Sequence, residues 1–203
     1  MTITKKMKKL LVLAFGLLVS ALSFADETPD VLIQRVTSEV LEIVRKDKDI
    51  QSGNTQKIIE LVDKKVLPHF NFTHMTALAV GREWRKASPQ QQQQLTAEFK
   101  TLLVRTYSNA LTSYKNQKVV LKPLKMNAGD TDVLVRSEIV QPGAKPVQLD
   151  YSLEKMDSGW KVYDVVVAGV SLVTNYRDQF SQEIRAGGID GLVASMIAKN
   201  KSL

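Results

Sequence analysis

The chain has 203 residues, of which 44% are hydrophobic and 24% are charged, and it contains no cysteine. This composition is typical of a globular protein, and the absence of cysteine excludes disulfide scaffolds, thiolate metal sites and cysteine nucleophiles. The formal charge of +7 includes four lysines near the N-terminus; removing them leaves 24 basic and 21 acidic residues and a charge of +3. Such a mild excess, scattered along the chain, does not indicate nucleic-acid binding.

Residues 1–25 have the pattern of a secretory signal peptide. The basic segment Lys5–Lys9 precedes an apolar run, Leu10–Val19, and the small residues Ser23 and Ala25 follow as in a cleavage site. The apolar run is shorter than the roughly 20 residues that span a bilayer, which argues against a membrane anchor. We therefore expect cleavage after Ala25 and an exported protein consisting of one domain, residues 26–203.

The first part of the expected mature chain, residues 28–116, is helical by pattern. Apolar residues recur every three or four positions in four stretches. The first stretch begins at Pro29, the third is stopped by Gly81, and the long fourth stretch follows the capping sequence Ser88-Pro89. The sequence thus predicts three shorter helices followed by one long helix.

Between residues 117 and 168 the hydrophobic period falls to two. Four short alternating runs are separated by turn sequences, which predicts an antiparallel meander of about four strands. The helical pattern returns over residues 170–199 and is interrupted at Gly187-Gly188. This order of elements predicts an α+β fold in which helices pack on one face of an antiparallel sheet.

The search for catalytic and metal-binding motifs is largely negative. The chain lacks a nucleophile elbow, a phosphate-binding glycine loop and a dinucleotide fingerprint. His69 and His74 are five residues apart without an adjacent carboxylate, which favours capping or surface roles over a metal site. Asp164 is placed by alternation on the apolar face of the last strand, where a structural aspartate is more common than a general base. The apolar surface itself is compatible with a filled core or with a hollow one, and periodicity does not distinguish the two.

Seven segments follow one another along the chain in a recognisable order: Pro68–Phe72, Val80–Trp84, Ala87–Gln90, Phe99–Leu103, Gly159–Val165, Gly169–Val173 and Gly187–Leu192. Taken in this order they resemble the MlaC family, also called the toluene-tolerance auxiliary component family, and the similarity extends from about residue 28 to residue 198. The resemblance implies a nuclear-transport-factor-like, or cystatin-like, sheet with a helical subdomain. It also implies a periplasmic phospholipid carrier of the Gram-negative envelope, which shuttles lipid between an outer-membrane lipoprotein complex and an inner-membrane ABC-transporter complex.

In this interpretation phospholipid is the cargo, and we expect a monomer without cofactor, catalytic activity or nucleic-acid partner. The acyl chains would occupy a slot between the sheet and the long helix. The residues expected to line the slot are Phe99, Leu102, Leu103, Tyr107, Leu111, Val133, Val135, Ile139, Leu149, Tyr151, Leu153, Val162 and Val166. Arg82, Arg85 and Arg177 can meet a phosphate or a partner protein, or can be ordinary surface arginines.

Two other functions stay open at the level of sequence. The first is an enzyme of the same broad sheet type, in which Asp164 and either Tyr107 or Tyr151 form an acid–base pair; only analogy of fold supports it. The second is a periplasmic chaperone that binds apolar protein segments.

Overall fold

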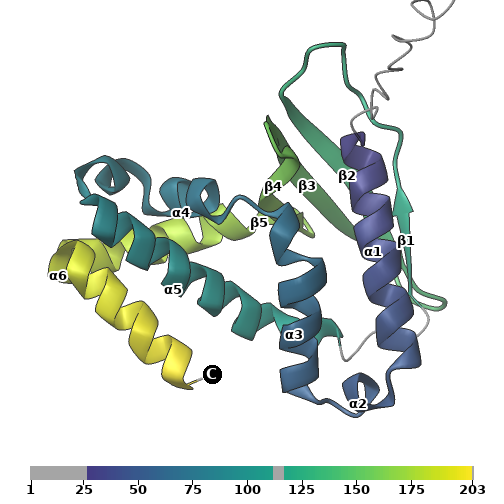
Figure 1. Cartoon of the computed structure of the whole chain (residues 1–203), viewed down its shortest axis with the longest axis horizontal. Coiled ribbons are helices and arrows are strands. Elements are labelled where there is room, and N and C mark those ends of the chain that lie inside the picture. The colour runs from purple at the N-terminus through teal and green to yellow at the C-terminus, as the bar shows by residue number, and fades with distance from the viewer. Residues whose placement is uncertain (1–26, 112–116, 203) are drawn as a thin grey trace, which may run out of the picture.

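The computed structural model describes residues 27–111 and 117–202 (Figure 1). The expected signal peptide, residues 1–25, therefore lies outside the described residues. The described chain forms a sheet with long N-terminal helices beside it and a second group of helices, α4 to α6, at the other end of the molecule (Figure 1). No helix in this part of the chain is long and apolar enough to cross a bilayer.

The N-terminal helices begin where the sequence predicts. Thr28 is the residue before α1, and Pro29 occupies the first helical position, where its missing N–H has no consequence. The side chain of Asn54 caps α3 by accepting a hydrogen bond from the backbone N–H of Lys57 at 3.2 Å. The bounds are α1 Pro29–Lys46, α2 Lys48–Gln51, α3 Thr55–Lys65 and the 3₁₀ turn η1 Leu67–His69.

The middle helices also end and begin at the expected signals. α4 stops at Gly81, whose φ of 68° is a conformation that residues with a Cβ rarely adopt. α5 begins with a capping box in which Ser88 and Gln91 satisfy each other's backbone N–H groups. The bounds are α4 Phe72–Val80, η2 Gly81–Lys86, α5 Pro89–Tyr107 and η3 Ser108–Leu111.

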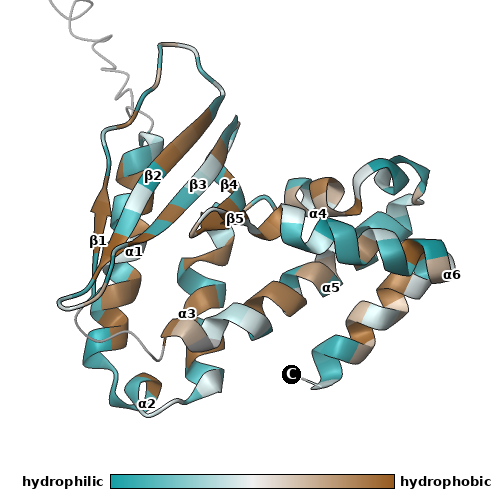
Figure 2. Ribbon diagram, turned by 180° about the vertical axis from the view of Figure 1, so that it is seen from behind, coloured by the Kyte–Doolittle hydropathy of each residue, from teal (hydrophilic) through white to brown (hydrophobic). Residues whose placement is uncertain are grey.

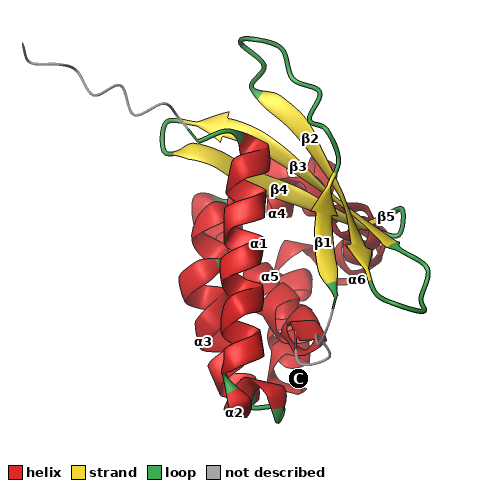
Figure 3. Ribbon diagram, turned by 90° about the vertical axis from the view of Figure 1, so that its right-hand side faces the viewer, coloured by secondary structure: helices red, strands yellow, loops and turns green. Residues whose placement is uncertain are grey.

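The strands form one antiparallel sheet in the order β1-β2-β3-β4-β5, which confirms the meander. The expectation of about four strands omitted β5, a two-residue strand that pairs with the end of β4. The bounds are β1 Lys118–Leu121, β2 Asp132–Val140, β3 Val147–Met156, β4 Gly159–Val167 and β5 Val170–Ser171. Helix α1 lies across one face of this sheet (Figure 3).

A bulge in β4 changes which of its side chains face the core. Two consecutive residues of β3 pair with Val162 and Asp164, so Tyr163 is an extra residue in β4. Because side chains alternate between faces, one extra residue reverses the pattern beyond it. Val165 is accordingly buried on the core side, and the expectation that Val166 shares the face of Val162 is wrong.

The chain ends in α6, Leu172–Ser202, which is two helical segments joined at a kink. Gly188 sits at the kink with φ 68° and ψ −168°, which confirms the predicted interruption. Asp164 holds the start of α6: its carboxylate accepts hydrogen bonds from Ser171 Oγ at 2.6 Å and from the backbone N–H of Val173 at 3.2 Å.

The buried apolar side chains of the described residues form three clusters. The sheet core packs α1 on the sheet and contains Leu32, Ile33, Val133, Val135, Leu153, Trp160, Val162 and Val165. The helical core joins α4, α5 and α6 and contains, among others, Met75, Leu95, Phe99, Leu102, Leu103, Tyr176 and Phe180. The N-terminal core joins α1, α2 and α3 through Val40, Val44, Ile50, Ile58, Leu61 and Val62.

This arrangement corrects the expected position of the long helix. α1, rather than α5, covers the sheet. α5 packs on α4 and α6, where the ring of Phe99 contacts those of Tyr176 and Phe180 edge-on, with centroids 5.1 Å apart in both pairs. The sheet and the long helix therefore belong to separate cores.

Candidate functional site

An apolar cavity of about 230 Å³ lies where the three cores meet. It is bounded by α1, α3, α4 and α5, by the turns η1 and η3, and by the adjoining parts of β4 and α6. Hydrophobic segments, brown in Figure 2, occur on α3 and α5 at this junction. The wall residues are Val40, Val62, Val66, Leu67, Phe70, Phe72, Met75, Leu103, Val104, Tyr107, Ser108, Leu111, Val165 and Leu172.

Residues distant in sequence form opposite walls of the cavity. Val40 of α1 and Val62 of α3 come from the N-terminal core, whereas Met75 of α4 and Leu103 of α5 come from the helical core. Val165 of β4 reaches the wall because the bulge turns it inward. The cavity thus lies between packed units and is not a defect inside any one of them.

Two wall residues carry a polar group, and they differ in exposure. The Tyr107 side chain is 40% exposed, so it lies at the rim of the cavity, where a ring can cover apolar atoms while its hydroxyl reaches water. Ser108 is only 4% exposed, and its hydroxyl has no hydrogen-bond partner among the described residues. An unpaired buried hydroxyl costs roughly 1–3 kcal/mol, so this group is a candidate partner for a polar atom of a ligand.

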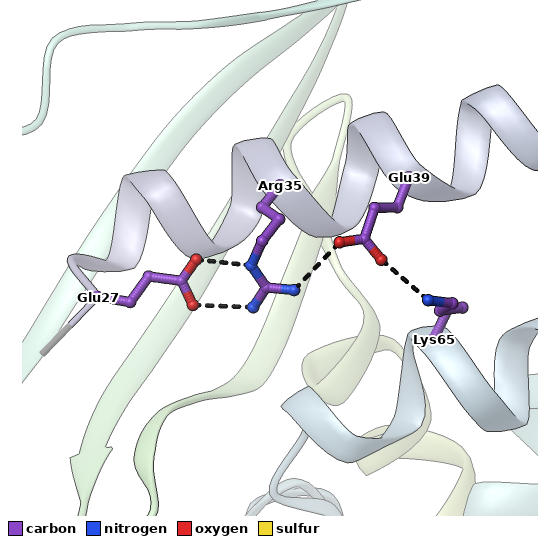
Figure 4. Close-up of polar contacts among 4 residues, drawn as sticks. All are labelled: Glu27, Arg35, Glu39 and Lys65. Carbon is purple, nitrogen blue, oxygen red and sulfur yellow. Dashed lines mark hydrogen bonds and ion pairs between the residues drawn. The ribbon is translucent and has the colours of Figure 1, made fainter. Parts of the chain in front are cut away.

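A chain of ion pairs joins the two helices that form one wall of the cavity (Figure 4). The guanidinium of Arg35 in α1 donates two hydrogen bonds to the carboxylate of Glu27, at 2.7 and 2.8 Å. It also lies 3.5 Å from Glu39, which in turn pairs with Lys65 of α3 at 3.1 Å. Arg35 lowers the pKa of Glu27, and Lys65 lowers the pKa of Glu39, because each cation stabilises the ionised carboxylate.

Three of the residues expected to line a slot do line this cavity: Leu103, Tyr107 and Leu111. Phe99 and Leu102 are instead buried in the helical core. The sheet core holds Val133, Val135, Leu153 and Val162 as buried members and Leu149 and Tyr151 as half-buried ones. Ile139 and Val166 are half-buried and, like these eight, do not line the cavity.

Most of the remaining wall residues were missed because they belong to or adjoin elements outside the expected slot: α1, α3, η1, α4 and α6. Val104, Ser108 and Val165 lie in elements that the expected slot already included. The apolar stripes of the first two predicted helices, which contain Val40, Val62 and Val66, are equally typical of an ordinary filled core. Four of the missed wall residues lie in family-like segments, which was the signal that could have found them: Phe70, Phe72, Val165 and Leu172.

Among the side chains considered for catalysis, Asp164 has a structural role and Tyr151 is half-buried. Asp164 is held by β5 and α6, and no hydrogen bond joins it to Tyr107 or Tyr151 in the described chain. Burial raises the pKa of Tyr151 to about 12, so this phenol remains protonated at neutral pH. The acid–base pair of the alternative enzyme hypothesis is therefore not assembled among the described residues.

His74 occupies a structural position. Its Nδ1 lies 2.9 Å from a carboxylate oxygen of Glu154, and its ring stacks on Tyr163 with centroids 4.5 Å apart. Within the described ranges, no three histidine, aspartate or glutamate side chains are grouped so that they can hold a metal ion.

Comparison with known proteins identifies the family. The family model described as MlaC protein matches residues 34–198. The chain belongs to the MlaC family. This assignment confirms the resemblance found in the sequence.

Individual relatives agree with the MlaC assignment. The chain is 30% identical over 186 residues to the toluene tolerance protein ttg2D of Pseudomonas putida, covering 88% of this chain and 86% of that protein. It is 26% identical over 182 residues to the intermembrane phospholipid transport system binding protein MlaC of Haemophilus influenzae, covering 88% and 85%. A phospholipid-binding protein from Ralstonia solanacearum, solved in complex with a phospholipid, is 42% identical and superposes with a TM-score of 0.81 over 88% of this chain and 98% of that one.

Proposed function

We propose that this MlaC-family protein is a phospholipid carrier that holds acyl chains in the cavity at the junction of its three cores. The observation that carries the proposal is the apolar wall of this cavity, in which Tyr107 and Ser108 are the polar members. The Ralstonia relative of the same fold supports it, because that protein was solved with a phospholipid bound. In this arrangement the head group stays at the surface, near the exposed rim residue Tyr107.

The energetics of lipid transfer explain why a carrier needs such a cavity. Each methylene exposed to water costs about 0.8 kcal/mol, so exposing two acyl chains of about fifteen carbons costs more than about 20 kcal/mol. This cost makes the free diffusion of a phospholipid through water negligible. A dry slot removes this cost without a catalytic group. The buried Ser108 hydroxyl, which has no partner among the described residues, would donate a hydrogen bond to an ester carbonyl of the lipid.

The size of the cavity indicates that loading requires movement. Its volume of about 230 Å³ lies below the roughly 300–1,000 Å³ of sites that enclose drug-sized ligands. Two acyl chains therefore need the walls to separate. Because opposite walls belong to different cores, we expect the helical core to move away from the N-terminal core, with loss of the contacts that Val104 and Leu111 make with the latter.

The same proposal includes the location and the route of the lipid. The signal-peptide pattern of residues 1–25 supports export to the periplasm, with the mature protein beginning at Asp26. The Haemophilus relative is named as part of an intermembrane phospholipid transport system, which supports shuttling between an outer-membrane lipoprotein complex and an inner-membrane ABC-transporter complex. N-terminal sequencing of periplasmic protein checks the first part; a retained Met1 on membrane-bound protein would contradict it.

Solvent extraction of the purified native protein tests the cargo directly. We expect phospholipid in the extract by mass spectrometry, at a defined ratio to protein. Val104→Trp places an indole at the cavity wall and should lower the co-purifying lipid severalfold. The matched control Val31→Trp changes an exposed position of α1 that is 51% accessible, and should leave the lipid content unchanged.

The outcomes separate the three functions. An extract without phospholipid from properly folded protein would favour the enzyme or the chaperone. Phospholipid that is retained equally by Val104→Trp and Val31→Trp would place the lipid outside this cavity.

A further inference from the structure

A second, larger depression lies on the surface of the helical end of the molecule. It is a cleft of about 740 Å³ between α4, η2 and α6, and it shares no wall residue with the apolar cavity. The two sites use different residues of α4: Phe72 and Met75 line the cavity, whereas His74 and Leu78 line the cleft. The cleft is therefore a separate surface feature.

Arginine is concentrated in this cleft. Its wall contains Arg82 and Arg85 of η2 and Arg177 and Arg185 of α6, but no lysine. The whole sequence contains eight arginines and twenty lysines, so half of the arginines gather at one place in a lysine-rich chain. The guanidinium group binds carboxylates with two parallel hydrogen bonds, which the lysine ammonium does not. This bias indicates a ligand that carries oxyanions.

No carboxylate within residues 27–111 and 117–202 pairs with any of the four arginines of the cleft. Among the described residues of the wall the one carboxylate is Glu83, which pairs with Lys86 at 2.9 Å. Elsewhere on the surface Arg35, Lys57 and Lys65 do have carboxylate partners.

Two of the arginines are held in position by neighbouring atoms. Arg177 Nε donates to the carbonyl oxygen of Leu78 at 3.0 Å, which ties α6 to α4. Arg185 donates through a terminal nitrogen to Ser181 Oγ at 2.7 Å. In each case the other N–H groups of the guanidinium make no hydrogen bond to the described part of the chain. Such positioning lowers the entropy that a ligand must offset on binding.

The shape and the floor of the cleft favour a protein segment over a membrane. A bilayer presents a broad surface to a basic patch, whereas a concave cleft admits a protruding chain. Half-buried Trp84, Leu78 and Ile184 add apolar surface between the arginines. Tryptophan and arginine are enriched among the residues that dominate binding energy at protein interfaces.

We propose that this arginine cleft is a docking site for an acidic segment of a partner protein. Aspartate or glutamate side chains of the segment would pair with the four guanidinium groups, and an apolar side chain would contact Trp84. The proposal rests on the proposed function, because a carrier that delivers lipid has to be held by a protein that accepts it. To the lipid-carrier function it adds the surface on which the partner docks and the acidic chemistry of that partner.

Charge reversal of the two η2 arginines tests the proposal. The probe is a short fluorescent peptide of aspartate, glutamate and leucine, with an asparagine–glutamine–leucine peptide of equal length as its neutral counterpart. We expect the mature protein to bind the acidic peptide with an affinity that falls as salt is raised. Arg82→Glu/Arg85→Glu should weaken this binding by about tenfold or more. Lys64→Glu/Lys145→Glu carries the same change in net charge at exposed positions outside the cleft, and should change binding by less than about twofold.

Two further measurements make each outcome decisive. The lipid content of Arg82→Glu/Arg85→Glu should equal that of the unmodified protein, which separates this proposal from the lipid-carrier function. Vesicles of phosphatidylglycerol test the membrane alternative. The proposal would be overturned if Arg82→Glu/Arg85→Glu lost vesicle binding but bound the acidic peptide as the unmodified protein does. It would also be overturned if both double variants bound the peptide equally weakly, or if Arg82→Glu/Arg85→Glu lost its bound lipid.

Discussion

Two leucines on α5 provide a matched test of whether the apolar cavity is a real space that a lipid fills. Leu95 is fully buried in the helical core, whereas Leu103 belongs to the same core but also faces the cavity. Truncation of a fully packed leucine to alanine costs about 2.7–5.0 kcal/mol, and the cost rises with the volume of the space left behind. A side chain beside an existing void has fewer contacts to lose.

We therefore expect the two substitutions to differ in the lipid-free protein. Leu95→Ala should lower the free energy of unfolding by close to 5 kcal/mol, at the upper end of the ~2.7–5.0 range, and Leu103→Ala by about 2.7 kcal/mol. At about 2–4 °C per kcal/mol for a protein of this size, the variants should melt about 5–9 °C apart. Thermal and urea denaturation of delipidated protein measure this difference.

Reloading with phospholipid should bring the two costs closer together. An acyl chain packed against Leu103 loses contacts when that residue becomes alanine, so the cost of Leu103→Ala rises in the loaded protein. Leu95 does not line the cavity, so the cost of Leu95→Ala stays the same. Equal costs in the lipid-free protein, or a lipid effect of the same size on both variants, would refute the assignment of the cavity as the lipid slot.

Three other predictions follow from the same structure. Delipidated protein should melt several degrees lower than loaded protein and bind a hydrophobic dye more strongly, since lipid binds only the native state; identical curves would count against a carrier. Ser108→Ala should stabilise the delipidated protein by about 1 kcal/mol and give no gain in the loaded one, and a loss in both states would mean that the hydroxyl is already satisfied. Because Arg35 lowers the pKa of Glu27, their pair stabilises the fold above the unfolded carboxyl pKa of about 4.5, and this contribution disappears as the pH falls through the lower native value. Both side chains are substantially exposed, so Arg35→Gln should cost at most about 1 kcal/mol in urea denaturation near pH 6 and nothing near pH 2; a cost that persists at the acidic end would assign the effect to packing.

Local signals in the sequence predicted the longer helices and the four main strands, but not the short elements α2 and β5. The capping box of Ser88 and Gln91, and the ends and kinks at Gly81 and Gly188, depend on atoms within a few residues of each other. The alternation of β2, β3 and β4 likewise predicts strands with one face toward a core. The family could also be recognised, because its segments are read in order along the chain.

The partners of the apolar faces were decided by the tertiary structure. α1 and α5 both carry an apolar stripe, and periodicity does not say which of the two covers the sheet. The bulge at Tyr163 is one residue long and leaves no signal in the hydrophobic pattern, yet it brings Val165 to the cavity in place of Val166. The cavity itself arises where three separately packed cores meet. Its position depends on how those cores fit together, and that is a property of the whole chain which no local stretch of sequence encodes.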